Sequence, residues 1–180
     1  MNHLKIRLII VLAFTYFSIA CPQEISRPNS AMKSPETLEI TSIEFSGGKT
    51  IVNMTVENRI QGGYFCADRN IFIIDQSGNR LKLLKALNIP TCPKSYNFRS
   101  IGEKLSFSLE FPPLNPGTGW IDIVEECNDN CFWFYGITLD PQLNKRLDDV
   151  FAIASSGKPE ENILLFRKML EEIDSSNRGI

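Results

Sequence analysis

Hydrophobic and polar residues alternate along much of the chain between residues 38 and 139, and this period of two constrains the fold more than any other feature. The clearest example spans residues 105–111, where Leu, Phe, Leu and Phe alternate with Ser, Ser and Glu. Such alternation is typical of a strand with one buried and one solvent-facing side. We therefore expect the central part of the chain to consist of half-buried β-strands.

Six further segments have the alternation or the composition of strands, and turn residues such as Gly, Pro and Asn separate them. The seven expected strands span residues 38–45, 51–57, 71–74, 80–84, 105–111, 120–126 and 132–139. In the first of them the buried side switches near the end, which indicates a β-bulge. The pattern predicts a mainly β fold over residues 37–141, an antiparallel sandwich or barrel, of which we take the β-sandwich of about seven strands.

After Asp140 and Pro141 the hydrophobic period changes to that of a helix. Two apolar stripes follow, and a break at Ser155-Ser156-Gly157 separates them. They consist of Leu143, Leu147, Val150, Phe151 and Ala154, and of Ile163, Phe166, Leu170 and Ile173. We predict two C-terminal α-helices in a helical extension over residues 142–180. We expect these helices to pack on the β region, the alternative being that they bind a partner.

The first 20 residues have the organisation of a cleavable signal peptide. Lys5 and Arg7 precede an apolar run over residues 8–17, which is short for a membrane-spanning helix, and small residues follow it. We therefore expect the protein to be exported into an oxidising compartment. Residues 21–36 are polar and contain three prolines, which favours a flexible tether between the leader and the domain.

The end of the leader, Ile19-Ala20-Cys21, is similar to the end of a bacterial lipobox. Ser18 departs from the Leu that this family usually has. The resemblance implies that Cys21 becomes the first mature residue and carries lipid, so that a membrane would be a partner of the protein. Ser18 and Ala20 also fit an ordinary signal peptidase, which would leave the protein secreted or periplasmic.

Five cysteines are present, so four can pair in an oxidising compartment and one is left over. Lipid on Cys21 would account for the odd one. Cys127 and Cys131 flank a short turn between two expected strands, where a disulfide can form, and Cys66 and Cys92 then pair by elimination. The other two pairings stay open. A zinc site of four thiolates is a rival interpretation.

Composition excludes several function classes. The only histidine, His3, lies in the leader, so the mature chain lacks the commonest general base and the commonest zinc ligand. The mature chain carries 17 basic and 21 acidic side chains, and its basic residues between Arg80 and Lys104 are spread out, as solvated positions are. We expect no nucleic-acid partner, no cofactor and no metal. Oxygens of Glu125, Glu126 and residues 128–130 are better explained by a plain turn than by a calcium site.

Aromatic residues gather on the last two expected strands. Alternation places Phe132, Phe134 and Gly136 on one side, and Trp133, Tyr135 and Ile137 on the other. Since both sides are apolar, one should be core, and the other should be covered by the helices or offered to a partner. We take Trp120, Trp133 and Tyr135 as the candidate binding residues.

The strand Gly119–Ile123, followed by Phe134–Ile137, resembles uncharacterised immunoglobulin-like domains of bacterial envelope proteins. The resemblance covers roughly residues 37–140. It implies an immunoglobulin-like β-sandwich and no catalytic residue. Our hypothesis is a non-enzymatic lipoprotein that binds or scaffolds a protein or glycan in the cell envelope. One alternative is a hydrolase of envelope glycans that uses the carboxylates Asp122 and Asp140. The other is a purely structural domain.

Overall fold

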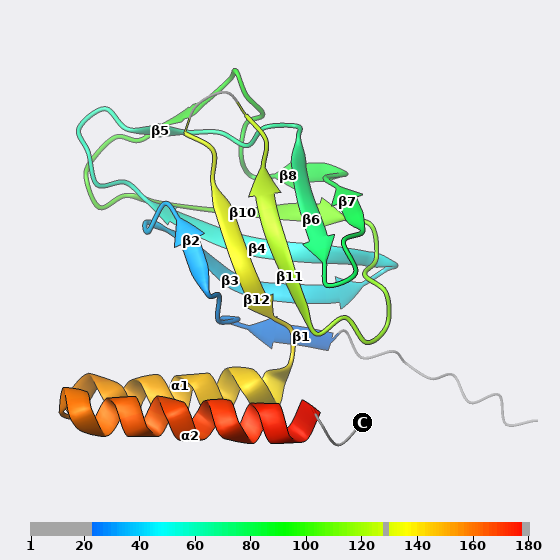
Figure 1. Ribbon diagram of the computed structural model, residues 1–180. Coiled ribbons are helices and arrows are strands. Elements are labelled where there is room, and N and C mark those ends of the chain that lie inside the picture. The colour runs from blue at the N-terminus through cyan, green and yellow to red at the C-terminus, as the bar shows by residue number, and fades with distance from the viewer. Residues whose placement is uncertain (1–22, 128–129, 178–180) are drawn as a thin grey trace, which may run out of the picture.

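The computed structural model describes residues 23–127 and 130–177, and these form a mainly β fold followed by two helices (Figure 1). The expected signal peptide and Cys21 lie outside the described residues, as do residues 128 and 129 of the expected turn. In the described part of the chain, no helix is both long enough and apolar enough to cross a membrane. All seven expected strands are present, and five short strands accompany them.

Ten of the strands form two antiparallel five-stranded sheets. The first sheet has the order β1 (Gln23–Ser26), β3 (Leu38–Ser46), β4 (Lys49–Glu57), β10 (Lys104–Phe111) and β8 (Lys85–Leu87). The second has the order β2 (Met32–Ser34), β12 (Trp133–Thr138), β11 (Trp120–Glu125), β6 (Ile71–Asp75) and β7 (Arg80–Lys82). A small third sheet pairs β5 (Tyr64–Phe65) with β9 (Tyr96–Asn97).

One hydrophobic core receives side chains from both large sheets. Val52 and Met54 of β4 enter it from the first sheet, and Ile121 and Ile123 of β11 enter it from the second; all four are completely buried. The small sheet closes one end, where the Phe65 ring lies 5.8 Å from that of Phe107 and 6.4 Å from that of Phe132. Burial of this apolar surface is the main force that holds the sheets together.

The expected hairpin at the start of the β region is confirmed. β3 and β4 pair around a turn at Gly47 and Gly48. The register shifts between Ile40 and Ser42, and this irregularity is the bulge that the hydrophobic pattern predicts. It lets Leu38 and Ile40 on one side of the shift, and Ile43 on the other, all reach the core.

The flexible tether that we predicted over residues 21–36 is wrong for its described part. Residues 23–26 form β1, which pairs with β3, and residues 32–34 form β2, which pairs with β12. Ile25 of β1 is 3% exposed and belongs to the core. These strands are too short to show a hydrophobic period, so their pairing to longer neighbours, which satisfies backbone donors and acceptors, is visible only in the fold.

The two helices are α1 (Pro141–Ser156) and α2 (Pro159–Asn177), which form a hairpin beside the sheets (Figure 1). Asp140 is the N-cap of α1: its Oδ1 accepts hydrogen bonds from the backbone N–H groups of Gln142 and Leu143, at 2.8 and 3.3 Å. Pro141 occupies the first helical turn, where its missing N–H costs nothing.

The helices meet the β region through polar contacts at the start of α1. The side chain of buried Asn144 donates to the Thr138 carbonyl at 3.0 Å and accepts from the Asn29 N–H at 2.7 Å. Farther along, the hairpin packs on itself, with the Phe151 and Phe166 rings 5.7 Å apart. Several apolar side chains of the hairpin stay exposed: Phe151, Ile153, Ile163, Leu164 and Leu170.

The expected packing of both stripes onto the β region is therefore not what the described residues show. In α2 the most buried apolar side chain is Met169, next to the half-buried Phe166, while Ile163 and Leu170 of the expected stripe are 54% and 66% exposed. The side chain of Ile173 lies outside the described residues. The buried side of α2 is rotated from the expected stripe because it faces α1 rather than a sheet.

The turn between β6 and β7 depends on one buried carboxylate. Asp75 is 4% exposed, and its Oδ1 accepts from the N–H groups of Ser77 and Asn79, both at 2.9 Å. Its Oδ2 accepts from the Asn79 side-chain amide at 2.8 Å. The hydrogen bond from the Asn79 side chain, helped by the two backbone donors, lowers the pKa of Asp75 below its ordinary value of 3.8.

Asp75→Asn should remove the titration while keeping the shape of this turn. Because the folded-state pKa is lowered, the ionised group stabilises the fold above pH 3.8, and this stabilisation is lost as the pH falls below that value. The free energy of unfolding, measured in urea between pH 2.5 and 7, should be higher for the wild type at neutral pH, and the difference should shrink in acid. Glu24→Gln, at an exposed position of β1, is the control. A difference that does not change with pH would contradict this assignment.

Candidate binding face

The outer side of the second sheet carries four aromatic side chains, of which Trp120 and Tyr135 are exposed and Phe72 and Trp133 are partly exposed. Residues on this side come from alternate positions of neighbouring strands, and the register aligns them in rows across the sheet. One row is Ser34, Trp133, Val124, Phe72 and Lys82. The next is Met32, Tyr135, Asp122, Ile74 and Arg80. Trp120 follows Asp122 on the same side of β11.

The three aromatic residues that the sequence singles out thus lie on one side of one sheet. Trp120 is 44% exposed and Tyr135 is 36% exposed. The rings of Trp133 and Tyr135 stack with their centroids 4.9 Å apart. We call the surface made by Met32, Phe72, Trp120, Trp133 and Tyr135 the aromatic face.

A bulge in β12 explains why Ile137 reaches the core, although strict alternation from the buried Phe134 would point it outward. Phe134 pairs with Ile123 and Ile137 pairs with Ile121, so Tyr135 and Gly136 together face Asp122 alone. Gly136 has φ +62°, and its N–H donates to Asp122 Oδ1 at 2.7 Å. Alternation continued through this point predicts that Ile137 lies outside. That placement is wrong, because Ile137 is completely buried.

The helices leave the aromatic face open. From the sequence we expected this side of the sheet either to be covered by the C-terminal helices or to be open to a partner. Trp120 and Tyr135 are exposed, so the expected cover is wrong for these two side chains. The reason is geometric, since α1 meets the sheet at Thr138, the last residue of β12, and runs away from that point (Figure 1).

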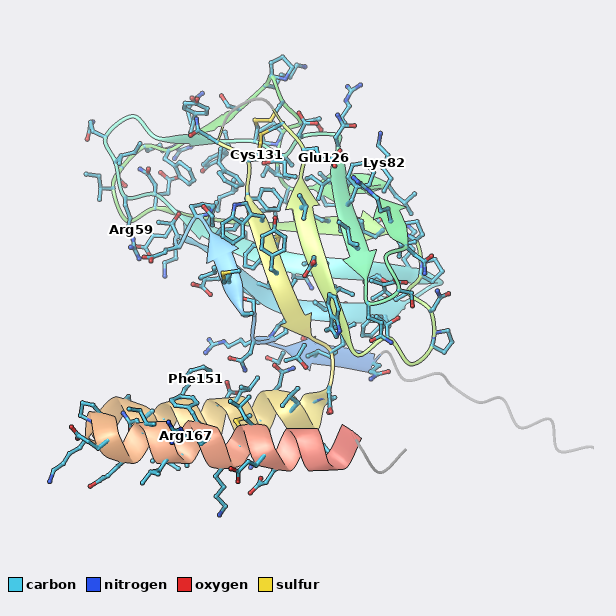
Figure 2. The ribbon with its side chains drawn as sticks, viewed as in Figure 1. Arg59, Lys82, Glu126, Cys131, Phe151 and Arg167 are labelled. Carbon is cyan, nitrogen blue, oxygen red and sulfur yellow. A yellow bond between two sulfur atoms is a disulfide. The ribbon has the colours of Figure 1, made fainter. Side chains whose placement is uncertain are left out.

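Cations line one edge of the face. The Arg80 guanidinium lies 4.3 Å from the centre of the Phe72 ring, and the Lys82 ammonium lies 5.8 Å from it. Arg80 also forms an ion pair with Glu126 at 2.5 Å. Figure 2 shows Lys82 and Glu126 at the upper end of the sheet. A ligand on this side would therefore meet flat aromatic surface first and positive charge at the β7 edge.

Both carboxylates of the alternative hydrolase interpretation have structural partners. Asp122 accepts the N–H of the β12 bulge, and Asp140 caps α1. A cavity of about 590 Å³ opens between the sheet edges near β2 and β3, and neither carboxylate lines it. In residues 23–127 and 130–177, no group of three or more His, Cys, Asp or Glu residues comes together as metal ligands would.

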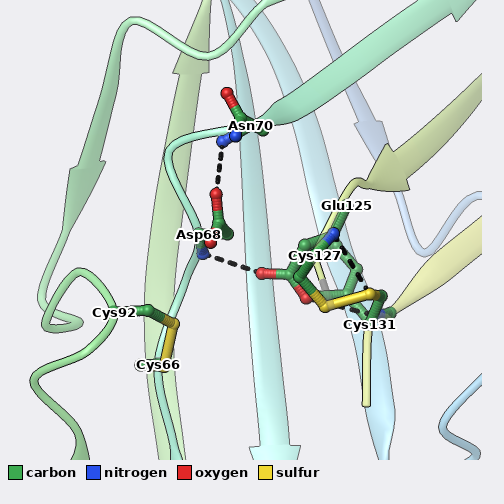
Figure 3. Close-up of a disulfide and its surroundings, with 8 residues drawn as sticks. Cys66, Asp68, Asn70, Cys92, Glu125, Cys127 and Cys131 are labelled. Carbon is green, nitrogen blue, oxygen red and sulfur yellow. Dashed lines mark hydrogen bonds between the residues drawn. A yellow bond between two sulfur atoms is a disulfide. The ribbon is translucent and has the colours of Figure 1, made fainter. Parts of the chain in front are cut away.

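The four remaining cysteines pair as expected. Cys66–Cys92 and Cys127–Cys131 form disulfides with Cα separations of 5.4 and 5.6 Å (Figure 3). This pairing contradicts the four-thiolate zinc site, because each of these four sulfur atoms is bonded to another sulfur and none is a thiolate. Disulfides persist in oxidising compartments, and these two indicate an environment outside the cytoplasm.

A buried carboxylate organises the end of the molecule that holds the disulfides. Glu125 is 7% exposed; its Oε1 accepts the Asp68 N–H at 2.7 Å and its Oε2 accepts the Phe132 N–H at 3.1 Å (Figure 3). Burial raises the pKa of Glu125, although the two N–H donors oppose that shift. Its oxygens therefore hold two backbone segments together.

Comparison with known proteins returns no relative: no family model matches the chain, and neither a curated protein nor a solved structure is similar to it. The candidate site therefore depends on geometry alone. Sequence reasoning identified Trp120, Trp133 and Tyr135 but missed Met32 and Phe72. Met32 lay in the expected tether, and Phe72 lay in an apolar run without alternation.

Gly136→Ala should distort the aromatic face. The backbone at residue 136 is left-handed, which is unfavourable for a residue with a Cβ, and the added Cβ would lie 3.1 Å from the Ala31 Cβ. We therefore expect the variant to lose roughly 1–2 kcal/mol of stability or more. Gly117→Ala is a matched control, because that glycine has φ +82° but open space around it. The measurements are urea unfolding and the tryptophan emission spectrum. Equal destabilisation by the two variants, with unchanged emission, would show that the bulge does not depend on Gly136.

Proposed function

We propose that this protein is a non-enzymatic, exported lipoprotein of a bacterial cell envelope whose β region binds a protein or glycan partner through the aromatic face. One observation carries the proposal: exposed Trp120, Tyr135 and Met32 lie on the same side of one sheet. Exposed apolar side chains that gather in a patch are typical of interaction sites, whereas scattered ones need no explanation. Aromatic side chains are also the residues that contribute most to binding energy.

We further propose that the β region is an immunoglobulin-like sandwich. Without the edge strands β1 and β2, the strand orders are β3-β4-β10-β8 and β7-β6-β11-β12. Named A to G along the chain, these are the orders A-B-E-D and C′-C-F-G of immunoglobulin domains. The common core between the two sheets supports the same assignment. The aromatic face then belongs to the C′-C-F-G sheet.

The two alternatives have weaker support. A purely structural domain would be expected to cover its aromatic side chains, and Trp120 and Tyr135 are open to solvent. A carboxylate hydrolase needs an acid and a base on either side of the bond that it cleaves. Here Asp122 and Asp140 each accept backbone hydrogen bonds that hold a bulge and a helix start.

Export and lipidation are supported by the leader, by the lipobox-like end of the leader and by the two disulfides. Because β1 begins at Gln23, only one residue separates it from Cys21. Two steps of extended chain span at most about 7 Å, so a lipid on Cys21 would hold the folded domain directly against the membrane surface. The bacterial lipid modification supplies several acyl chains, as stable anchoring requires.

Intact protein from its native cells should lack residues 1–20 and carry lipid on Cys21. Mass spectrometry of the N-terminal peptide and incorporation of labelled palmitate test this expectation. Cys21→Ser should abolish the label, whereas Cys66→Ser, which removes a disulfide partner, should not. An unmodified Cys21 in the mature protein, or label that persists in Cys21→Ser, would exclude lipidation.

Binding at the aromatic face has a built-in reporter, because both tryptophans of the chain, Trp120 and Trp133, lie on it. Soluble peptidoglycan fragments and detergent-solubilised envelope proteins are titrated separately, and tryptophan emission and acrylamide quenching are recorded. We expect one of the two classes to shift the emission to the blue and reduce quenching.

In the same titration, Tyr135→Ala should weaken binding about fivefold to tenfold, as loss of an interface aromatic does. Ile60→Ala, which alters a 66% exposed side chain elsewhere, is the matched control. If neither class changes the emission, or if the two variants bind equally, the aromatic face is not the binding site.

A further inference from the structure

A second concave site lies at the β7 edge of the second sheet, where the chain crosses from β7 to β8. Its volume is about 410 Å³, and its lining consists of Arg69, Lys82, Lys85, Thr91 and the intervening residues 83, 84 and 86. Three of these side chains are cationic, and the lining includes no Asp or Glu. We call this site the cationic pocket.

The walls of the cationic pocket are fixed by covalent and backbone contacts. On one side Ala67 and Thr91 form a parallel β-bridge beside the Cys66–Cys92 disulfide. On the other side the Leu83 N–H donates to the Ile71 carbonyl in the second sheet, and the Leu84 N–H donates to the Glu110 carbonyl in the first, both at 2.8 Å. The cations therefore project from backbone that is tied to both sheets and to a disulfide.

Carboxylates near the cationic pocket are engaged elsewhere. Glu110, which faces Lys85 across the sheet, forms an ion pair with Lys49 at 2.6 Å. Asp68, the neighbour of Arg69 in the chain, accepts the Asn70 N–H at 2.8 Å.

The cations themselves have little to neutralise them. Lys82 donates to the neutral Asn70 side chain at 3.1 Å. Within the described residues, the side chains of Arg69 and Lys85 take part in no ion pair. Among the described residues, no carboxylate lines the cationic pocket or forms an ion pair with one of its three cations.

We propose that the cationic pocket binds an oxyanion, that is a phosphate, sulfate or carboxylate group. A planar guanidinium and two ammonium groups around one concavity supply the charged donors that such anions prefer. From the sequence we expect Lys82 and Lys85 to be separate solvated positions. Only the crossover between the sheets brings them together with Arg69, which lies more than ten residues earlier in the chain.

The cationic pocket adjoins the aromatic face through Lys82, whose ammonium lies 5.8 Å from the centre of the Phe72 ring. An oxyanion in it could therefore be free in solution or part of a larger molecule that also covers the aromatic face. The site goes beyond the function proposed above and does not depend on it, since a face that binds a neutral partner would leave the cationic pocket unchanged.

The test is a titration of the folded domain with inorganic phosphate at constant ionic strength, followed by amide chemical shifts. We expect saturable shifts at residues 82–86 and 91. Arg69→Gln combined with Lys85→Gln should weaken binding at least tenfold. Lys145→Gln combined with Arg167→Gln, which removes the same charge from the helical hairpin, should leave it unchanged. All four positions are exposed, and thermal unfolding verifies that both double variants fold.

Shifts that grow without saturation, or equal titrations of the two double variants, would overturn the proposal. A second arm uses an oligomer of galacturonic acid in place of phosphate. The carboxylates of this oligomer can enter the cationic pocket while its sugar rings cover the aromatic face. In that case the amide chemical-shift changes of the pocket residues and the change of tryptophan emission will have the same midpoint in oligomer concentration. If the amide shifts of the pocket residues change and the tryptophan emission does not, the cationic pocket is a site for a free oxyanion.

Discussion

Two five-stranded sheets share one apolar core. This shared core determines to which side of its sheet each remaining strand residue points. Alternate residues of a strand point to opposite sides, so each residue committed to the core sends its neighbours outward. On β11 the burial of Ile121 and Ile123 places Trp120, Asp122 and Val124 on the outer side. The aromatic face is therefore a direct consequence of the core, and no rearrangement of one strand could hide it without exposing core residues.

The part of the fold that the sequence predicted is the part encoded by long periodic strands. Alternation over residues 105–111 identifies β10, and the switch of buried side in β3 identifies its bulge. The bulge in β12 escaped prediction because its neighbours, Phe134 and Ile137, are both apolar and fit either continuation of the pattern. Only pairing with β11 selects one of them, and that pairing is not local information.

Edge strands and helix docking were missed for a different physical reason. β1 and β2 contain three or four residues each, so backbone pairing to a long neighbour stabilises them more than any pattern of their own. The start of α1 is held by Asn144, a polar residue that a hydrophobic stripe ignores. At the candidate site the aromatic residues could be predicted from the sequence. Met32 and the neighbouring cations could not, because they join the site only through the way the fold brings distant segments together.

Carboxylates hold loops that the core does not reach. Their pKa values shift in opposite directions, because one carboxylate accepts a strong hydrogen bond and the other is deeply buried. Glu103 accepts from the Tyr96 hydroxyl at 2.6 Å and from the Arg99 N–H at 2.6 Å, and the hydroxyl donor lowers the pKa of Glu103. Glu125, by contrast, is deeply buried, and burial raises its pKa. Acid therefore loosens the Glu103 contact while it removes the cost of burying charge at Glu125.

The position of Glu125 explains why a costly buried charge is tolerated. It joins residue 68 to residue 132, two loops that leave different strands and each carry a disulfide nearby. The amide of a glutamine has one acceptor oxygen, whereas a carboxylate has two, so Glu125 accepts each N–H group on a separate oxygen. The Cys66–Cys92 bond constrains about 27 residues and reduces the entropy of the unfolded chain by an amount worth about 3–4 kcal/mol. The two disulfides and the two-acceptor carboxylate therefore tie together, at one end of the molecule, the loops that flank β6, β11 and β12.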